Sequence, residues 1–401
     1  MRFRTLALTA AGLLALTGPA FAADAPGVTA SEIKIGNTMP YSGPASAYGV
    51  IGKGETAFWK MVNDHGGVDG HQIDFISVDD GYNPAKTVEQ ARRLVEEEGV
   101  AFLFNPLGTP SNTAIEKYMN AKKVPQLFVA TGADKWGDYK HFPWTMGWQP
   151  SYRTEAQIYA KYILKVRPNA KIAILYQNDD FGKDYIAGLK DVLGAKYAKM
   201  VVKEASYEVT DPTIDSQIVT LQASGADTLV TAATPKFAAQ AIRKVYDIGW
   251  KPMHFLTNVS LSVASVMIPA GAEKGVGVIT SNYGKDPTDP AWANDPGMNE
   301  WRAFMKKYLP DADIKDNNYV YAYGVSLTML QVLKQCHGDF SRANIMKQAA
   351  NLKGLVLPTS LPGIKISTSA SNYHPIRQMQ LQRWDGKTWV RFGDVISGAA
   401  S

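Results

Sequence analysis

The chain has 401 residues, of which 45% are hydrophobic, and a formal net charge of +5 at pH 7. This length suits two domains of roughly 150 residues each, with cores of sufficient size to be stable. The small net charge gives no indication of a nucleic-acid partner. Cys336 is the only cysteine, which excludes an intrachain disulfide, and its apolar helical surroundings predict a buried thiol.

The first residues have the features of a secretory signal peptide. Arg2 and Arg4 precede an apolar run over residues 6–16, and Ala20-Phe21-Ala22 supplies a small-x-small cleavage site. The apolar run is well below the roughly 20 residues that a membrane-spanning helix needs. We therefore predict a signal peptide over residues 1–22 and export of the remaining chain.

Short apolar strands then alternate with amphipathic helical patterns. Strands are predicted over residues 32–39, 71–80, 100–105 and 125–130, with helices over 49–63, 83–97 and 111–122. After an irregular aromatic stretch at 137–152 the pattern restarts. Strands are predicted over 171–178, 200–207, 228–233, 254–259 and 276–282, with helices over 183–193, 214–223, 235–247, 292–308 and 319–335.

The last predicted element is a hairpin over residues 378–395 around Asp385-Gly386. The alternation before it favours parallel sheets covered by helices on both faces. We predict an α/β fold of two Rossmann-like, doubly wound lobes. In such folds ligands bind beyond the carboxyl ends of the strands, so the loops that follow the strands are the candidate site.

Two of these loops are rich in small polar groups. In the segment GTPSN, Gly108 allows close approach of the backbone, and Thr109 and Ser111 offer hydroxyl donors near a helix N-terminus. Capping of the helix by Ser111 alone is an equally open interpretation. A phosphate loop is disfavoured, because the pattern GxxxxGK[ST] and a nearby lysine are both missing.

The next strand ends in the same way, with Ala130, Thr131 and Gly132. Two adjacent strand ends with small donors favour a singly charged anion such as a carboxylate. No nucleophile elbow, metal-ligand spacing or dinucleotide fingerprint is present in the sequence. The adjacent pairs Asp79-Asp80 and Asp179-Asp180 stand at strand ends, where neighbouring side chains point to opposite faces, so neither is a natural acid/base couple. We therefore predict a binding protein rather than an enzyme, with no metal and no cofactor.

The loops, together with three longer segments, carry a resemblance to a known family. The segments are IKIGNTMPYSGPASAYGVIGKG, NDHGGVDGHQIDFISVDDGYNPAKTVEQARRLV and ILYQNDDFGKDYIAGLK. From residue 33 to the C-terminal hairpin the sequence resembles the branched-chain-amino-acid family of type I periplasmic substrate-binding proteins for ABC transporters. The resemblance implies two lobes joined by a three-strand hinge, a periplasmic location, a monomer, and delivery of the ligand to a membrane permease.

The resemblance also implies lobe boundaries and site residues. The N-terminal lobe would comprise residues 23–148 plus 281–360 and the C-terminal lobe 149–280 plus 361–401, with crossovers near 148–151, 276–281 and 358–366. The ligand carboxylate would be held by Gly108, Thr109, Ser111, Ala130, Thr131 and Gly132. The remaining ligand contacts would come from Tyr48, Tyr152, Phe181, Thr234 and Asn258.

Two departures from the family pattern bear on the ligand. Amino-acid-binding members have an acidic residue in the loop where Asn258 and Val259 stand here, and the disulfide of leucine-type members would fall at Tyr82 and Leu107. Without a charge partner a buried ammonium group is costly. The missing charge partner therefore favours a carboxylate without an amine. The aromatic residues Trp136, Trp144, Trp148 and Tyr152 favour an aromatic acid, and packing of these tryptophans between the lobes is the alternative interpretation. For the function there are two alternatives: the protein binds a branched-chain or other amino acid for the same type of transporter, or it is a ligand-sensing receptor of the same fold.

Overall fold

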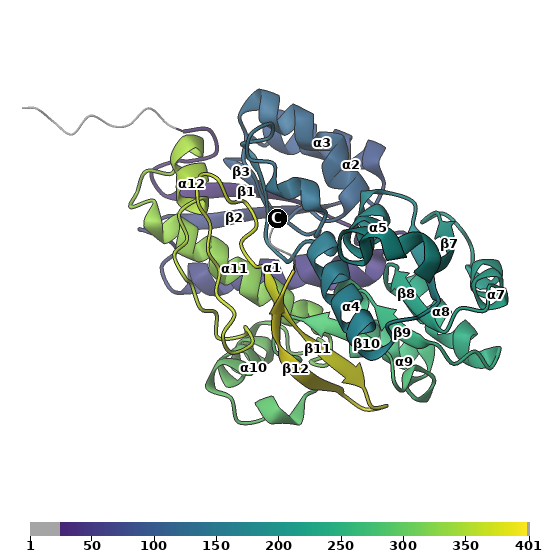
Figure 1. Ribbon diagram of the computed structural model, residues 1–401. Coiled ribbons are helices and arrows are strands. Elements are labelled where there is room, and N and C mark those ends of the chain that lie inside the picture. Colours follow the sequence, from purple (N-terminus) through teal and green to yellow (C-terminus); the bar gives the residue numbers. More distant parts are fainter. Residues whose placement is uncertain (1–24, 399–401) are drawn as a thin grey trace, which may run out of the picture.

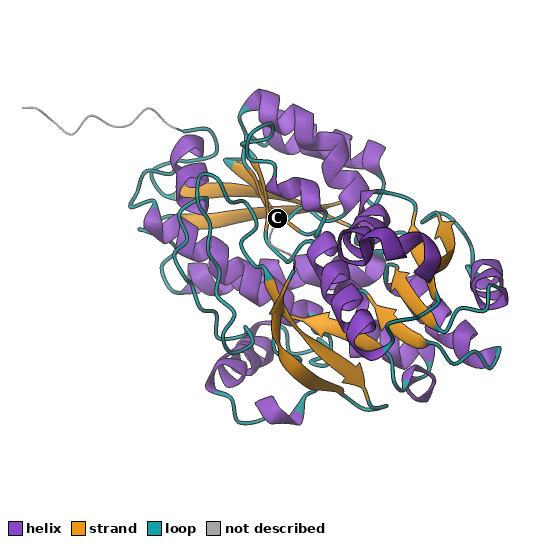
Figure 2. Cartoon of the chain, viewed as in Figure 1, coloured by secondary structure: helices purple, strands orange, loops and turns teal. Residues whose placement is uncertain are grey.

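The computed structural model describes residues 25–398 and contains two α/β lobes, each built on one sheet (Figure 1). The predicted signal peptide, residues 1–22, lies outside the described residues. Helices surround the strands of both sheets (Figure 2). No helix within residues 25–398 is long and apolar enough to cross a membrane. The predicted α/β fold of two doubly wound lobes is confirmed.

The first lobe contains a parallel five-stranded sheet with the strand order β2-β1-β3-β4-β5. Its strands are β1 (Glu32–Met39), β2 (Gln72–Asp79), β3 (Phe102–Phe104), β4 (Gln126–Val129) and β5 (Thr145–Gly147). Its helices are α1 (Gly49–Asp64), α2 (Pro84–Arg92), α3 (Thr109–Lys122), α10 (Pro296–Tyr308), α11 (Asn318–Gln335) and α12 (Arg342–Ala349). The last three helices belong to this lobe because α10 and α11 pack on α1, and α12 packs on α11.

Alternation along the strands produces a core on each face of this sheet. Ile35 packs with Phe58 and Trp59 of α1 on one face. Leu103 packs with Ala91 of α2 and Ile115 of α3 on the other face. Parallel strands buried on both faces explain why the sequence segments of β3 and β4 are almost continuously apolar.

The second lobe contains a seven-stranded sheet with the order β12-β11-β10-β9-β8-β6-β7. Its parallel strands are β6 (Ile172–Gln177), β7 (Val201–Tyr207), β8 (Thr228–Ala232), β9 (Met253–Leu256) and β10 (Ile279–Asn282). An antiparallel hairpin at one edge is formed by β11 (Gln378–Trp384) and β12 (Trp389–Ser397). The helices are α4 (Tyr152–Val166), α5 (Asp180–Leu193), α6 (Tyr197–Met200), α7 (Asp215–Ala223), α8 (Pro235–Asp247) and α9 (Ile268–Ala270).

The chain passes between the lobes three times, after β5, after β10 and before β11 (Figure 1). The segment before β11 still contacts the first lobe, because the Tyr373 hydroxyl donates to the Pro143 carbonyl oxygen at 3.1 Å. The lobe boundaries inferred from the sequence, including the point of the third crossing, stay a prediction.

Most predicted elements agree with the structure, but β5, α4, α12 and the short helices α6 and α9 were not predicted. The aromatic stretch at 137–152 was interpreted as irregular, although it contains β5 and ends at the start of α4. A signal for α4 was present: Ser151 is its N-cap, and its Oγ accepts a hydrogen bond from the Thr154 backbone N–H.

The predicted start of α3 was two residues late. The helix begins at Thr109, with Gly108 as its N-cap residue at a φ of 105°. Ser111 is therefore inside the first turn and is not the N-cap. Its Oγ forms a hydrogen bond with the Thr87 hydroxyl at 2.9 Å instead.

Cys336 is buried, as predicted, and its Sγ lies 3.3 Å from the Val332 carbonyl oxygen. Burial raises the pKa of the Cys336 thiol to about 12. A buried, protonated thiol is a poor nucleophile.

We expect Ellman's reagent to modify Cys336 in urea-unfolded protein but not in native protein over the same time. An added thiol at exposed Ser371, in Ser371→Cys, is the control for native reactivity, and rapid labelling of native Cys336 would contradict the assignment.

Candidate functional site

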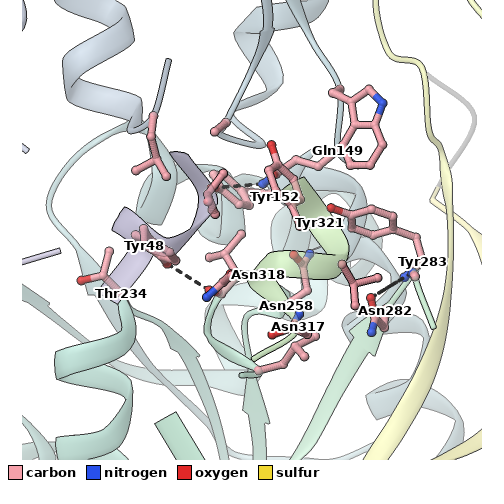
Figure 3. Close-up of a pocket in the computed structure, with 18 of the residues that line it drawn as sticks. Tyr48, Gln149, Tyr152, Thr234, Asn258, Asn282, Tyr283, Asn317, Asn318 and Tyr321 are labelled. Carbon is pink, nitrogen blue, oxygen red and sulfur yellow. Dashed lines mark hydrogen bonds between the residues drawn. The ribbon is translucent and has the colours of Figure 1, made fainter. Parts of the chain in front are cut away.

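A pocket between the two lobes brings together loops that follow strands of both sheets (Figure 3). Its empty volume is about 880 Å³, which includes open space at its mouth. Concave sites lined by apolar and aromatic side chains with a few polar groups commonly hold small molecules. Among the described residues, no group of His, Cys, Asp or Glu is arranged to hold a metal ion.

The structure brings most of the predicted site residues to this pocket. Those that line it are Tyr48, Gly108, Thr109, Ala130, Tyr152, Phe181, Thr234 and Asn258. Three predicted residues do not line it, namely Ser111, Thr131 and Gly132. The role of each residue as a ligand contact stays a prediction.

The two small-residue loops of the first lobe are joined directly. The Thr109 and Thr131 hydroxyl oxygens lie 2.5 Å apart, and the Gly108 N–H donates to the Ala130 carbonyl oxygen at 3.3 Å. Gly108 is required here because its φ is positive and because a Cβ atom would lie 2.7 Å from the Tyr82 ring.

The hydrogen bonds around Thr131 determine what Thr109 can offer. Thr131 Oγ1 accepts hydrogen bonds from the Ala133 N–H at 3.3 Å and the Trp136 indole N–H at 3.4 Å. Because two N–H groups are directed at Thr131 Oγ1, the arrangement favours Thr131 as the donor and Thr109 as the acceptor of the bond between them. The Thr109 proton is then available to the pocket, so Thr109 presents a hydrogen-bond donor there.

Aromatic rings form much of the pocket wall. Tyr152 lies against Phe181 with ring centroids 4.6 Å apart, and Trp148 meets Tyr321 edge-on at 5.2 Å. The Trp148 indole N–H donates to the Thr328 hydroxyl at 3.0 Å, so this side chain contributes an apolar surface to the pocket.

Gly132 packs against the Tyr152 ring without lining the pocket itself. A Cβ atom at Gly132 would lie 2.9 Å from the Tyr152 ring, and the Tyr152 N–H donates to the Gly132 carbonyl oxygen at 2.7 Å. The small residue therefore allows Tyr152 to reach its position.

The lobes are in contact across the pocket. The Tyr48 hydroxyl donates to the Val259 carbonyl oxygen at 3.0 Å, and Gln177 Nε2 donates to the Tyr82 hydroxyl at 3.3 Å. The Ser262 hydroxyl donates to Asp316 Oδ1 at 2.9 Å. Each bond joins a residue of the first lobe to one of the second, so the conformation is a closed one.

Charge is almost absent from the lining. Lys285 is the only charged residue among the lining residues, and its ammonium group lies 2.7 Å from Asp295 and donates to the Pro358 carbonyl oxygen. No aspartate or glutamate lines the pocket. The pocket, as described, contains no carboxylate that could contact an ammonium group of a ligand.

One acidic residue lies directly behind the lining, and the sequence analysis missed it. Glu155 of α4 is completely buried and lies behind Asn258. Its carboxylate contacts five donors: the Tyr159 and Tyr185 hydroxyls, the Ser281 hydroxyl at 2.9 Å, and the Asn258 backbone and side-chain N–H groups at 2.8 and 2.7 Å. Burial is the largest influence on Glu155 and raises its pKa to about 7, although the hydrogen bonds act in the opposite direction.

Sequence reasoning also missed the side of the pocket near the hinge. Asn282 and Tyr283 come from the end of β10, and Asn317 and Asn318 from the start of α11 (Figure 3). Asn282 and Tyr283 could have been found from the sequence, because β10 was predicted and ligands in such folds bind beyond the carboxyl ends of strands. The α11 residues precede a helix and follow no strand, so only the packing of α11 on α1 places them here.

We expect Gly108→Ala to weaken ligand binding as well as stability, because the new Cβ meets the Tyr82 ring. The strained backbone alone costs about 1–2 kcal/mol. Gly66→Ala is the matched control, since Gly66 also has a positive φ, of 96°, but has nothing within 4 Å of the added Cβ. Urea denaturation and ligand titration on both variants test this. Equal effects on binding would contradict the special role of Gly108.

We expect the buried Glu155 carboxylate to make stability depend on pH. Its pKa rises from 4.5 to about 7 on folding, so between these values the folded protein holds a proton that the unfolded chain releases. The stabilising contribution is complete below pH 4.5 and is lost as the pH rises to about 7. In urea denaturation, Glu155→Gln should therefore lose less stability than wild type over this interval. Glu97→Gln, at an exposed site, is the control, and a slope unchanged by Glu155→Gln would refute the assignment.

Comparison with known proteins agrees with this architecture. The family profile described as Periplasmic binding protein matches residues 32–388. Leu/Ile/Val-binding protein homolog 7 of Brucella suis biovar 1 (strain 1330) is 25% identical over 418 residues, covering 99% of this chain and 98% of the relative.

Two solved structures share the fold. One is a branched chain amino acid ABC transporter from Thermus thermophilus with bound valine, with a TM-score of 0.83, 14% identity, and coverage of 92% of this chain and 97% of that one. The other is a solute binding protein of an ABC transporter from R. palustris in complex with 4-hydroxybenzoate, with a TM-score of 0.77, 18% identity, and coverage of 92% and 98%. The chain belongs to the periplasmic binding protein family: it is a solute-binding protein with the two-lobed type I fold and is not an enzyme.

Proposed function

We propose that this protein is the periplasmic receptor of an ABC importer and that its ligand is an aromatic or other carboxylate without an amino group. The observation that carries the proposal is the donor character of Thr109 in a pocket that no acidic side chain lines. The proposal includes export through the signal peptide at 1–22, function as a monomer, and recognition of the closed form by a membrane permease.

The anion end of the ligand is assigned to the first lobe. Thr109 offers its hydroxyl proton, and the first turn of α3 adds a partial positive charge from the helix dipole. Hydroxyl and amide donors suit a singly charged carboxylate, because no cation is needed to balance one charge.

The aromatic wall supports a planar ligand. Tyr152, Phe181 and Trp148 present ring faces and edges to the pocket, and rings gain by offset or edge-to-face contact with one another. The R. palustris structure shows that a protein of this fold accommodates 4-hydroxybenzoate.

Amino-acid binding is the second candidate, because the Thermus structure holds valine and the Brucella relative is named for leucine, isoleucine and valine. An ammonium group in this pocket would be buried without a carboxylate in contact, which is costly. A third candidate is a sensing role, in which the same receptor fold presents its ligand to a regulator and not to a permease. A regulator gene beside this one, in place of permease and ATPase genes, would favour sensing.

A thermal-shift screen of the mature protein tests the ligand class. Aromatic and aliphatic carboxylates should raise the melting temperature, because a ligand at about 100 times its Kd adds about 2.7 kcal/mol of stability. Leucine and valine should leave it unchanged. A shift with leucine or valine and none with the carboxylates would overturn the proposed ligand.

Thr109→Val tests the carboxylate grip with the ligand found in that screen. Loss of a hydrogen bond to a charged group should weaken binding about tenfold or more. Thr113→Val is the matched control, since Thr113 lies exposed on the same helix and does not line the pocket. Isothermal titration of both variants measures the difference in affinity. An unchanged affinity of Thr109→Val would disprove the hydrogen bond between Thr109 and the ligand carboxylate.

A further inference from the structure

We propose that Glu155 holds Asn258 in one orientation, so that the second lobe presents a hydrogen-bond acceptor to the ligand. The ligand is then a carboxylate that carries a neutral donor, a hydroxyl or an N–H group, at the end away from Thr109. This inference rests on the proposed function and deepens it, because it specifies the second recognised group. Glu155 is a positioning residue here, since it acts through Asn258 and does not line the pocket.

The orientation of Asn258 follows from two hydrogen bonds to one carboxylate. Its backbone N–H donates to Glu155 Oε1 at 2.8 Å, and its side-chain Nδ2 donates to Oε2 at 2.7 Å. Oε1 also accepts from the Ser281 hydroxyl at 2.9 Å, and Oε2 contacts the Tyr185 hydroxyl. While Glu155 is ionised, a flipped amide would place an oxygen against Oε2, and two acceptors in contact repel each other.

The remaining polar atom of the Asn258 side chain is Oδ1. It makes no hydrogen bond with any residue of the described part of the chain, and it is not among the fully buried polar atoms that lack a partner. Asn258 is nearly fully buried and lines the pocket (Figure 3). Oδ1 is therefore the atom that meets a ligand.

Four further side-chain amides line the same pocket, those of Gln149, Asn282, Asn317 and Asn318. Asn317 has a buried Oδ1 without a hydrogen-bond partner within residues 25–398. The loops that carry Asn258 and Asn317 are joined by the bond between Ser262 and Asp316. No hydrogen bond among the described residues fixes the Asn317 amide, so it can turn to match a ligand, whereas Asn258 cannot.

The fixed acceptor selects among the possible ligand ends. A second carboxylate would place like partial charges in contact at Oδ1. An ammonium group would find no carboxylate in the lining, because the Glu155 oxygens are already engaged behind Asn258. An apolar end would leave Oδ1 unpaired on closure, which carries a desolvation penalty. A neutral donor is the group that avoids all three penalties.

Matched pairs of acids that differ by one terminal hydroxyl test the inference. Suitable pairs are benzoate and 4-hydroxybenzoate, 3-phenylpropanoate and 3-(4-hydroxyphenyl)propanoate, and hexanoate and 6-hydroxyhexanoate. They are titrated by calorimetry against the mature protein above about pH 8, where Glu155 is ionised. In the pair that fits the pocket, the hydroxylated acid should bind at least about tenfold more tightly. Equal affinity within every pair that binds would overturn the inference and leave the proposed function intact.

Glu155→Gln provides a readout that a merely structural role would not change. The backbone N–H of Asn258 cannot turn, so the oxygen of the new amide takes the place of Oε1 and its NH₂ group that of Oε2. Asn258 must then flip and present its NH₂ group to the pocket. The preference for the hydroxylated acid should fall to about one or reverse, and an unchanged preference would overturn the inference.

Two further variants separate orientation from general damage. Asn258→Ala should lose the preference for the hydroxylated acid while it still binds the plain acid through Thr109, which keeps the test decisive if Glu155→Gln does not fold. Tyr159→Phe removes one contact of Glu155 but leaves the bond between Nδ2 and Oε2, so the preference should persist. Loss of the preference in Tyr159→Phe as well would overturn the inference. If no acid in the panel binds, or only amino acids bind, the proposed function and the inference both fail.

Discussion

The buried carboxylate of Glu155 is the interaction on which the geometry of the second lobe's pocket wall depends. It joins α4, α5, the turn after β9 and the hinge strand β10 through Tyr159, Tyr185, Asn258 and Ser281. A carboxylate in an apolar interior is unfavourable unless its oxygens are matched by donors. Because several elements must supply those donors together, the wall has one low-energy arrangement.

The first lobe achieves the same precision with uncharged groups. A glycine without a Cβ admits the Tyr82 ring, and a chain of hydrogen bonds from the Trp136 and Ala133 N–H groups through Thr131 orients the Thr109 hydroxyl. The two lobes therefore present complementary chemistry, a donor from the first and an acceptor from the second. In the proposed function, closure brings both to one ligand. The bond between Tyr48 and Val259 shows that the two lobes are in contact.

Much of this was open to prediction from the sequence. The alternation of strands and helices gave the correct fold, and the strand-end rule led to Gly108, Thr109, Ala130, Phe181 and Asn258, which line one pocket. The rule does not distinguish a side chain that reaches the pocket from one that supports it. Thr131 and Gly132 follow β4 as predicted, yet one orients Thr109 and the other makes space for Tyr152.

The two-lobed α/β fold could be predicted from the sequence alone, because hydrophobic periodicity and turn residues act over short distances along the chain. The sequence also showed that the loop at Asn258 has no acidic residue. Only the tertiary structure placed Glu155 behind that loop, since the two residues are 103 positions apart and their contact depends on how α4 packs against the sheet. The loop thus has no acidic residue of its own, and the nearby carboxylate is that of Glu155, which lies behind the pocket lining and accepts hydrogen bonds from Asn258.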